Sequence, residues 1–187
     1  MECDNPDNDC IDRNFLNMNH ALKSPIERTR HSILREFVGT EPNSVSVGCG
    51  GYEPVVIGTQ NAVDVNLRAE HYLRSVGFSG PFFQADVRKI PVSDKFYKIA
   101  VCSEVIEHLS TFEDVRAAIL EVNRISERWI FTTPCKACFD PDHKFLFSES
   151  DLKNLFAGLN FQIFIYGYFF YISNDGQRLN SIILRKP

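Results

Sequence analysis

The pattern of apolar and polar positions predicts strands that alternate with helices from residue 44 onward. Ahead of them, a first helix begins at Ser24, where Ser-Pro-Ile-Glu is a capping box with proline in the first helical position, and it ends at Gly39. Short apolar runs predict strands, and longer amphipathic stretches predict helices. The predicted strands are 44–47, 62–65, 82–86, 98–102 and 129–133, and the predicted helices are 67–76, 111–125 and one capped by Ser148.

The end of the chain reads as two further β-rich runs, 161–173 and 181–185, separated by Asn174, Asp175 and Gly176. These three residues are a hairpin signal. Strands that alternate with helices form a parallel sheet with right-handed crossovers. We therefore expect a doubly wound, mostly parallel α/β fold of the Rossmann-like type, with an antiparallel hairpin at its C-terminal edge.

Composition fits one domain. The chain has 187 residues, 44% of them hydrophobic, which suffices for a single core. We assign this domain to residues 24–187 and read the Asn- and Asp-rich segment 1–23 as a mobile arm or lid. An acidic N-terminus is not a secretory signal, no apolar run is long enough for a membrane helix, and six cysteines suit a reducing compartment. The expectation is a cytoplasmic protein without a membrane partner.

A glycine turn, Gly48-Cys49-Gly50-Gly51, follows the first predicted strand. It is either an ordinary tight turn or a loop that lets a ligand approach the backbone at the carboxyl edge of the sheet. Asp64 ends the neighbouring strand, where a carboxylate can accept hydrogen bonds from ribose hydroxyls. Because Glu53 replaces the third glycine of the dinucleotide fingerprint, NAD is disfavoured against another nucleoside-containing ligand.

Several segments resemble class I methyltransferases, in particular the broad group of small S-adenosylmethionine-dependent enzymes. They occur in the family's order and cover residues 44–187: SVSVGCGG (44–51), AVDVN (62–66), FFQADVRKIPVSDKFYKIAVCSEVIEHL (82–109), FTTP (131–134) and HKFLFSESDL (143–152). The resemblance implies transfer of a methyl group from S-adenosylmethionine to an acceptor. It also implies a cofactor site made of Gly48, Cys49, Gly50, Glu53, Asp64, Val65, Asn66, Asp86, Val87, Ser103 and Glu104.

Three residues depart from the family pattern. Ser46 replaces an acidic residue in the strand before the loop, Tyr52 replaces a later glycine, and Pro54 shortens the first crossover helix. Glu53 is a candidate to supply the missing carboxylate. These departures leave a second hypothesis open, a noncatalytic binding module or partner subunit with the same fold.

Candidate catalytic bases are Glu107, His108 and His143, each with a structural role as its alternative. Together with Glu104 they offer two carboxylates and two imidazoles, a set suited to a divalent metal. That set resembles the site of metal-dependent enzymes that 2′-O-methylate RNA 3′ ends, which gives a third hypothesis. Because the Glu-Glu-His cluster is also common in metal-free members, we expect no metal.

The acceptor is not encoded in an obvious motif. A net charge of −4, from 20 basic and 24 acidic residues, favours a small molecule or a protein side chain over nucleic acid. The aromatic run 166–171 is either core plus a homodimer contact or the lining of an acceptor pocket. Cys135 and Cys138 are either free thiols or, with Cys3 and Cys10, a zinc site.

Overall fold

The computed structural model describes residues 24–136 and 142–186. Seven strands form one sheet in the order β3-β2-β1-β4-β5-β7-β6. Pairing is parallel from β3 to β5 and antiparallel at β5–β7 and β7–β6. The strands are β1 (Ser44–Val47), β2 (Asn61–Asp64), β3 (Phe82–Gln84), β4 (Tyr97–Ser103), β5 (Ser126–Pro134), β6 (Gln162–Tyr166) and β7 (Phe169–Ser173).

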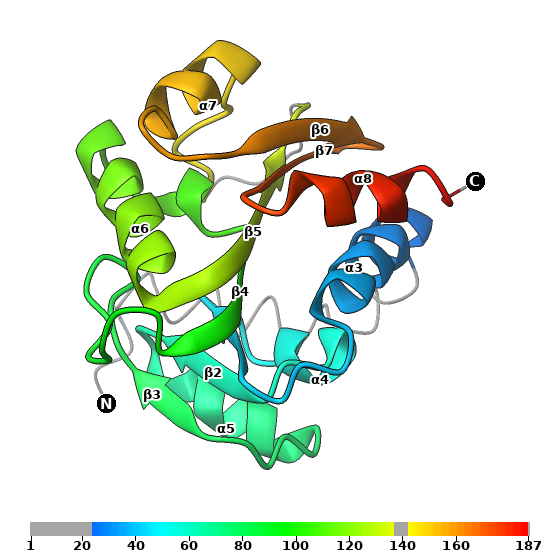
Figure 1. The fold of residues 1–187 in the computed structure, drawn as a ribbon. Helices are drawn as coiled ribbons and strands as arrows, with labels where there is room; N and C mark the ends of the chain where they lie inside the picture. The colour runs from blue at the N-terminus through cyan, green and yellow to red at the C-terminus, as the bar shows by residue number, and fades with distance from the viewer. Residues whose placement is uncertain (1–23, 137–141, 187) are drawn as a thin grey trace.

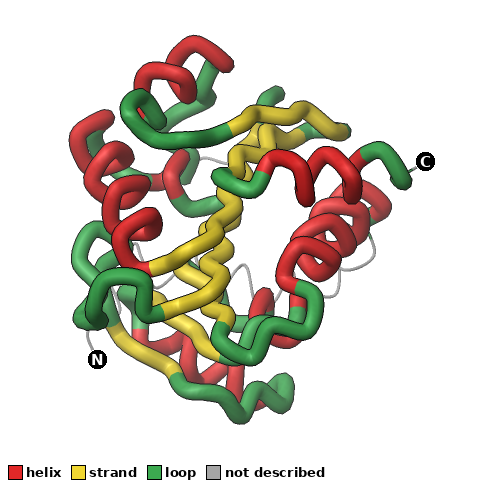
Figure 2. The backbone as a smooth tube through the Cα atoms, viewed as in Figure 1, coloured by secondary structure: helices red, strands yellow, loops and turns green. Residues whose placement is uncertain are grey.

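Helices cover both faces of this sheet, which Figure 1 shows nearly edge-on, with α3, α4 and α8 on one side and α6 and α7 on the other. Figure 2 shows the same layers by secondary structure. The helices are α3 (Pro25–Val38), α4 (Glu53–Ile57), α5 (Leu67–Ser75), α6 (Phe112–Ile125), α7 (Glu149–Leu155) and α8 (Gly176–Ile183), with a 3₁₀ turn, η1, at Ile106–His108.

The central strand β4 shows why both faces are covered. Its side chains alternate, as the pleat requires, and both sets are buried. Ile99 and Val101 pack into the core under α3 and α8. Ala100 and Cys102 pack into the larger core under α6 and α7, which also holds the only tryptophan, Trp129.

The sequence located the first helix and the short crossover correctly. Ser24 caps α3 by accepting a hydrogen bond from the Glu27 N–H, and Gly39 ends the helix at φ 65°. The crossover helix α4 has only five residues, with Pro54 in its first turn. Ser148 caps α7 with a complete capping box that includes Asp151.

The sequence predicted an antiparallel C-terminal hairpin correctly but placed its turn at the wrong residues. The turn lies between β6 and β7, at Gly167, whose φ is 62°. Asn174-Asp175-Gly176 is not a turn between strands, because the Asp175 side chain accepts a hydrogen bond from the Arg178 N–H and caps α8. The predicted strand at 181–185 was therefore wrong, and most of it is helical.

Within the described residues, no helix is both long and apolar enough to cross a membrane. The proposed arm at 1–23 lies outside the described residues. So do Cys3, Cys10 and Cys138 of the suggested zinc site. Cys49 and Cys102 are buried free thiols, as core packing predicted, and Cys135 is a partly buried free thiol.

Candidate active site

The glycine loop leaves β1 at the carboxyl edge of the sheet, and its backbone needs glycine. Gly48 and Gly50 have φ values of 69° and 58°, in the region that side chains disfavour. A Cβ on Gly48 would lie 2.4 Å from a Val105 methyl carbon, whereas a Cβ on Gly50 would have no atom within 4 Å. Gly48 thus packs against the chain, while Gly50 borders open space that a ligand could fill.

Asp64, at the end of β2, ties this loop to the neighbouring strand. Its Oδ2 accepts a hydrogen bond from the Gly50 N–H at 3.1 Å, and its Oδ1 accepts one from the Asn66 N–H at 2.9 Å. Burial raises the pKa of the Asp64 carboxyl, and these backbone donors oppose that rise. Cys49 Sγ also lies 3.8 Å from Oδ2, so the carboxylate is held firmly against the loop.

Glu53 lies beneath the loop and is buried. Ser46, on β1, donates a hydrogen bond to Glu53 Oε2 at 3.1 Å, and Arg30 Nη1 lies 3.3 Å from Glu53 Oε1. Burial raises the pKa of the Glu53 carboxyl, and the Arg30 charge opposes that rise. A carboxylate from α4 therefore stands against the strand position where Ser46 replaces the family's acidic residue.

Arg30 is a residue of this site that the sequence analysis missed. Its guanidinium donates to Glu27 Oε2 through Nε and Nη2, and Nη2 also lies 3.2 Å from His31 Nε2. Its Nη1 donates to Glu53 and to Ser103 Oγ. All five N–H directions have partners, so Arg30 links α3 to α4 and to the end of β4.

Glu104 follows β4 in a strained conformation, with φ 55° in a residue that is not glycine. Its Oε1 accepts a hydrogen bond from Thr132 Oγ1 at 3.0 Å, and Thr132 also bonds Ser103 Oγ at 2.9 Å. Burial raises the pKa of Glu104 to about 7, against the effect of Arg30. The left-handed residue turns the chain sharply out of β4 and into η1.

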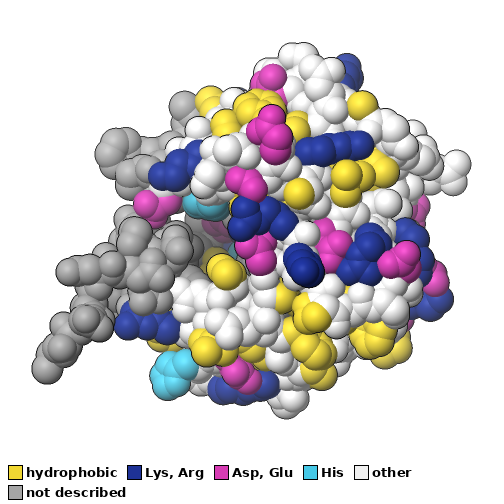
Figure 3. Space-filling model, turned by 90° about the vertical axis from the view of Figure 1, so that its left-hand side faces the viewer, with side chains coloured by type: hydrophobic (Ala, Val, Ile, Leu, Met, Phe, Trp, Pro, Cys, Tyr) yellow, Lys and Arg dark blue, Asp and Glu magenta, His cyan; other side chains and the backbone are white. Residues whose placement is uncertain are grey.

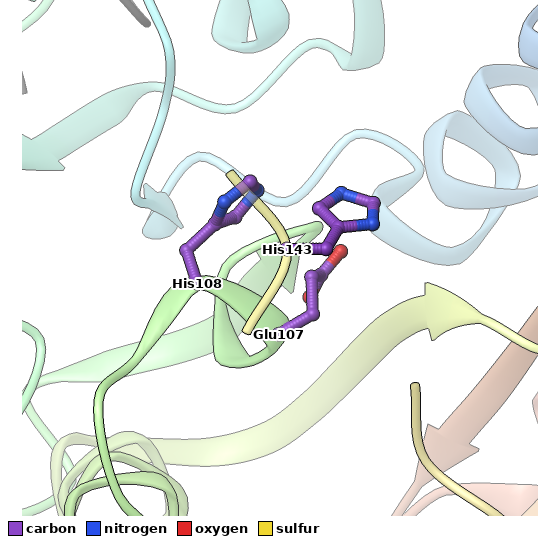
Figure 4. A group of neighbouring side chains, drawn as sticks. All are labelled: Glu107, His108 and His143. Atoms are coloured by element: carbon purple, nitrogen blue, oxygen red, sulfur yellow. The ribbon is translucent and has the colours of Figure 1, made fainter. Parts of the chain in front are cut away.

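Glu107, His108 and His143 come together, and Figure 4 shows their side chains side by side, two from η1 and one from the loop before α7. One ligand atom from each lies within 4.8 Å of the others. The two imidazole centroids are 4.8 Å apart. The loop is held there by Lys144 N–H, which donates to the Glu107 carbonyl at 2.8 Å.

Glu107 is fully buried. Its Oε2 accepts a hydrogen bond from Thr133 Oγ1 at 3.2 Å, whereas its Oε1 has no hydrogen-bond partner among the described residues. Burial, followed by the nearby Glu104, raises the pKa of this carboxyl. An unpartnered buried oxygen beside two imidazoles is suited to bind a cation or to accept a proton.

The remaining predicted cofactor residues lie along the same edge but are less enclosed. Asn66 caps α5, and the Val65 side chain is exposed. Asp86 pairs with Arg88 at 2.5 Å, and this partner lowers the pKa of the carboxyl. Val87 is buried in the main core.

Comparison with protein-family models matches residues 45–128 to a family described as a methyltransferase domain. A search of curated proteins finds no match. Solved structures with the same fold include the N-methyltransferase NodS from Bradyrhizobium japonicum in complex with S-adenosyl-L-homocysteine. That chain is 18% identical, with a TM-score of 0.68, and 87% of this chain and 94% of that one are covered.

Two further solved structures extend the likeness. A putative S-adenosyl-L-methionine-dependent methyltransferase from Methanococcus maripaludis has 14% identity and a TM-score of 0.68, with 92% of this chain and 96% of that one covered. A possible histamine N-methyltransferase from Thermotoga maritima has 17% identity and a TM-score of 0.62, with 87% and 97% covered. The chain thus has the Rossmann-like class I methyltransferase fold, and its residues 45–128 match the model of the methyltransferase-domain family.

Proposed function

We propose that the protein is an S-adenosylmethionine-dependent methyltransferase. The observation that carries the proposal is the joining of the glycine loop to Asp64 through the Gly50 N–H, with open space in front of Gly50. This arrangement suits a nucleoside, because the Asp64 carboxylate can accept hydrogen bonds from ribose hydroxyls beside a backbone that allows close approach. The bound S-adenosyl-L-homocysteine of the NodS structure supports the same choice of cofactor.

The surroundings of the loop favour a cationic ligand. Glu53 and Glu104 lie near one another, and the only arginine that contacts them among the described residues, Arg30, has its donors engaged. Excess negative charge in a buried site attracts a cation more strongly than it would in water. S-Adenosylmethionine carries both a sulfonium and an ammonium group, so this site would prefer it to its neutral-sulfur product.

We assign the cofactor contacts residue by residue. Asp64 would bind the ribose, and Glu53, positioned by Ser46 and Arg30, would bind the ammonium of the amino-acid end. Asp86 and Val87 would border the adenine, and Ser103 and Glu104 the region of the sulfur. The cofactor supplies the electrophilic methyl group, so the protein needs only to position the acceptor and remove its proton where necessary.

Glu107, His108 and His143 are the candidates for that proton transfer. They lie at the carboxyl edge beyond Glu104, within reach of one another. Figure 3 shows Lys and Arg side chains interspersed with Asp and Glu on one face, without a broad basic stripe. This supports a small molecule or a protein side chain as the acceptor over a long polyanion.

Calorimetry with S-adenosylhomocysteine and S-adenosylmethionine tests the cofactor assignment. We expect both to bind, and we expect Asp64→Asn to weaken binding at least tenfold. Asp94→Asn, at a carboxylate whose side chain is 77% exposed, is the matched control and should bind normally. Absence of binding at millimolar cofactor would overturn the proposal.

Methyl transfer from radiolabelled cofactor to a cell extract separates an enzyme from a noncatalytic module. We expect a labelled component with the unaltered protein and none with Asp64→Asn. Cofactor binding without any labelled component would support the module instead.

A second candidate function is metal-dependent 2′-O-methylation at an RNA 3′ end. The observation in its favour is the convergence of Glu107, His108 and His143 around an unpartnered buried oxygen. One carboxylate and two imidazoles are ligands that suit Mn²⁺ and related divalent ions. The geometry thus adds to the sequence resemblance for three of its four residues, since Glu104 is not in this group.

Titration with Mn²⁺ decides between this candidate and the metal-free site expected from the sequence. The candidate requires one bound ion per chain, lost in both Glu107→Gln and His143→Ala but kept in His71→Ala, a change at an exposed histidine on α5. It also requires methylation of a short RNA that stops with EDTA and returns with Mn²⁺. Activity that survives EDTA, without Mn²⁺ binding, would leave the metal-free prediction standing.

A further inference from the structure

A pocket of about 190 Å³ lies between the first turn of α3 and the β6–β7 hairpin. The hairpin side of this pocket is almost entirely aromatic, from Tyr166, Tyr168, Phe169 and Tyr171. Ligand pockets for drug-sized molecules usually measure about 300–1,000 Å³. The smaller volume here suits one ring system.

The strand pattern explains this lining. Phe169 and Tyr171 alternate along β7, so both side chains face α3, where they are buried in the smaller core. Gly167 makes the tight turn and leaves Tyr168 at the rim, 47% exposed. The pocket therefore has a fixed aromatic floor and an open aromatic edge.

Topology places this pocket beside the reaction site. Phe169 pairs with Pro134, the last residue of β5, so the hairpin turn lies at the carboxyl edge of the parallel strands. The Arg30 guanidinium lies over the Phe169 ring, 5.3 Å from its centroid, and the same guanidinium contacts Glu53 and Ser103. One arginine side chain thus separates the aromatic floor from the proposed cofactor contacts.

Two cations already occupy the aromatic faces. Besides Arg30 over Phe169, the Lys136 ammonium lies 4.7 Å from the centroid of Tyr168. A cationic ligand would meet both positive charges, whereas a neutral, electron-rich ring can stack between tyrosines without that repulsion. The charges therefore select against an ammonium group at this position.

We propose that this pocket binds a neutral planar aromatic ring carried by the methyl acceptor. The inference rests on the proposed function, because it assigns the acceptor side of the same site. Stacking on the tyrosines would hold the ring at the hairpin, and the remainder of the acceptor would extend past Arg30 toward Glu104 and Glu107.

Ligand-observed NMR with p-cresol and indole, on protein saturated with S-adenosylhomocysteine, tests the proposal. Tyr168→Ala should weaken both probes about tenfold, as expected for the loss of one stacking partner, and Tyr168→Phe should retain them. Phe96→Ala is the matched control, because Phe96 is also 47% exposed and follows a different turn, before β4. Cyclohexanol, which is apolar but not flat, should bind at least tenfold more weakly.

The outcomes separate this inference from the cofactor assignment. If S-adenosylhomocysteine binds while p-cresol and indole do not, or bind equally to Tyr168→Ala, the pocket proposal is wrong and the cofactor assignment stands. Equal binding of cyclohexanol would also overturn it. Adenosine is added in a separate arm. If adenosine binds to protein whose cofactor site is already filled, and if this binding depends on Tyr168, the ring pocket is supported. The aromatic ring that it binds would then be a nucleobase.

Discussion

Ser46 donates a hydrogen bond to Glu53 Oε2 at 3.1 Å, so the two residues together place a carboxylate beside the glycine loop. The serine is on β1 and the glutamate on the five-residue crossover helix α4. The short crossover helix therefore carries a carboxylate that lies against the strand position where the family's acidic residue is missing.

This arrangement predicts unequal effects of two substitutions on cofactor affinity. Glu53→Gln should weaken S-adenosylmethionine binding about tenfold, because it would remove the proposed charge-assisted hydrogen bond to the ligand. Ser46→Ala should have a smaller effect, because Arg30 still holds the carboxylate. Calorimetry measures both, with Glu70→Gln in an exposed helical ion pair as the control. A larger loss in Ser46→Ala than in Glu53→Gln would contradict the assignment.

Two substitutions in the glycine loop should differ in effect, one mainly on the stability of the fold and the other mainly on cofactor binding. Gly48→Ala should destabilise the fold by about 2 kcal/mol or more, because it adds steric overlap with Val105 to an unfavourable φ. Gly50→Ala has only the backbone cost of about 1 kcal/mol, yet its methyl group enters the open space before the loop. Urea unfolding and calorimetry of both variants check this. Normal cofactor binding by Gly50→Ala would show that the ligand lies elsewhere.

His31 predicts a loss of stability in acid. Burial and the adjacent Arg30 charge lower the pKa of this histidine from 6.5 to about 3. Between these values the unfolded chain binds a proton that the folded chain does not, so stability falls as pH decreases from 6.5 toward 3. At pH 5 the resulting loss in the free energy of unfolding is about 2 kcal/mol.

The test compares His31→Gln with the unaltered chain, because glutamine keeps an acceptor for Arg30 and cannot titrate. Chemical unfolding at pH 7 and pH 5 should show a loss that is about 2 kcal/mol smaller in the variant. Equal losses in the two proteins would mean that His31 is protonated in the folded state.

The two serine caps should differ in strength. Ser148 belongs to a complete capping box and accepts from the Asp151 N–H at 3.2 Å, and Asp151 accepts from the Ser148 N–H at 2.9 Å. Ser24 accepts from Glu27 at 3.5 Å, while the Glu27 side chain is engaged with Arg30. Ser148→Ala should cost about 1 kcal/mol and Ser24→Ala less, as measured by denaturant midpoints. The opposite order would show that the long Ser24 contact is the stronger cap.

The sequence predicted the alternation of strands and helices well, because period-two and helical patterns are local signals. The hairpin at the C-terminus failed for a specific reason. Asp and Asn followed by Gly can form a β-turn or can begin a helix, since the same side-chain oxygen accepts a hydrogen bond from the backbone in both cases. Asp175 caps a helix, whereas the turn residue Gly167 was hidden among aromatic residues.

The candidate site likewise contains residues that the sequence located and residues that it could not. The loop glycines follow one predicted strand and Asp64 lies near the end of the next, so topology alone brought them together. Arg30 could not be found by motif, because its partners Glu53 and Ser103 are distant in sequence and meet it only after α3 packs on the sheet. The joining of His143 to Glu107 likewise depends on a loop conformation that no local pattern specifies.

Arg178, near the end of the chain, donates hydrogen bonds to the carbonyls of Phe37 and Glu36 at 2.9 Å each. The last helix, α8, therefore completes the packing of the first described helix, α3, which carries Arg30. During synthesis on a ribosome, α3 emerges long before the residues that cover it. Closure of so long a loop is entropically costly and slow, so the site edge held by Arg30 becomes ordered only after α8 has been synthesised.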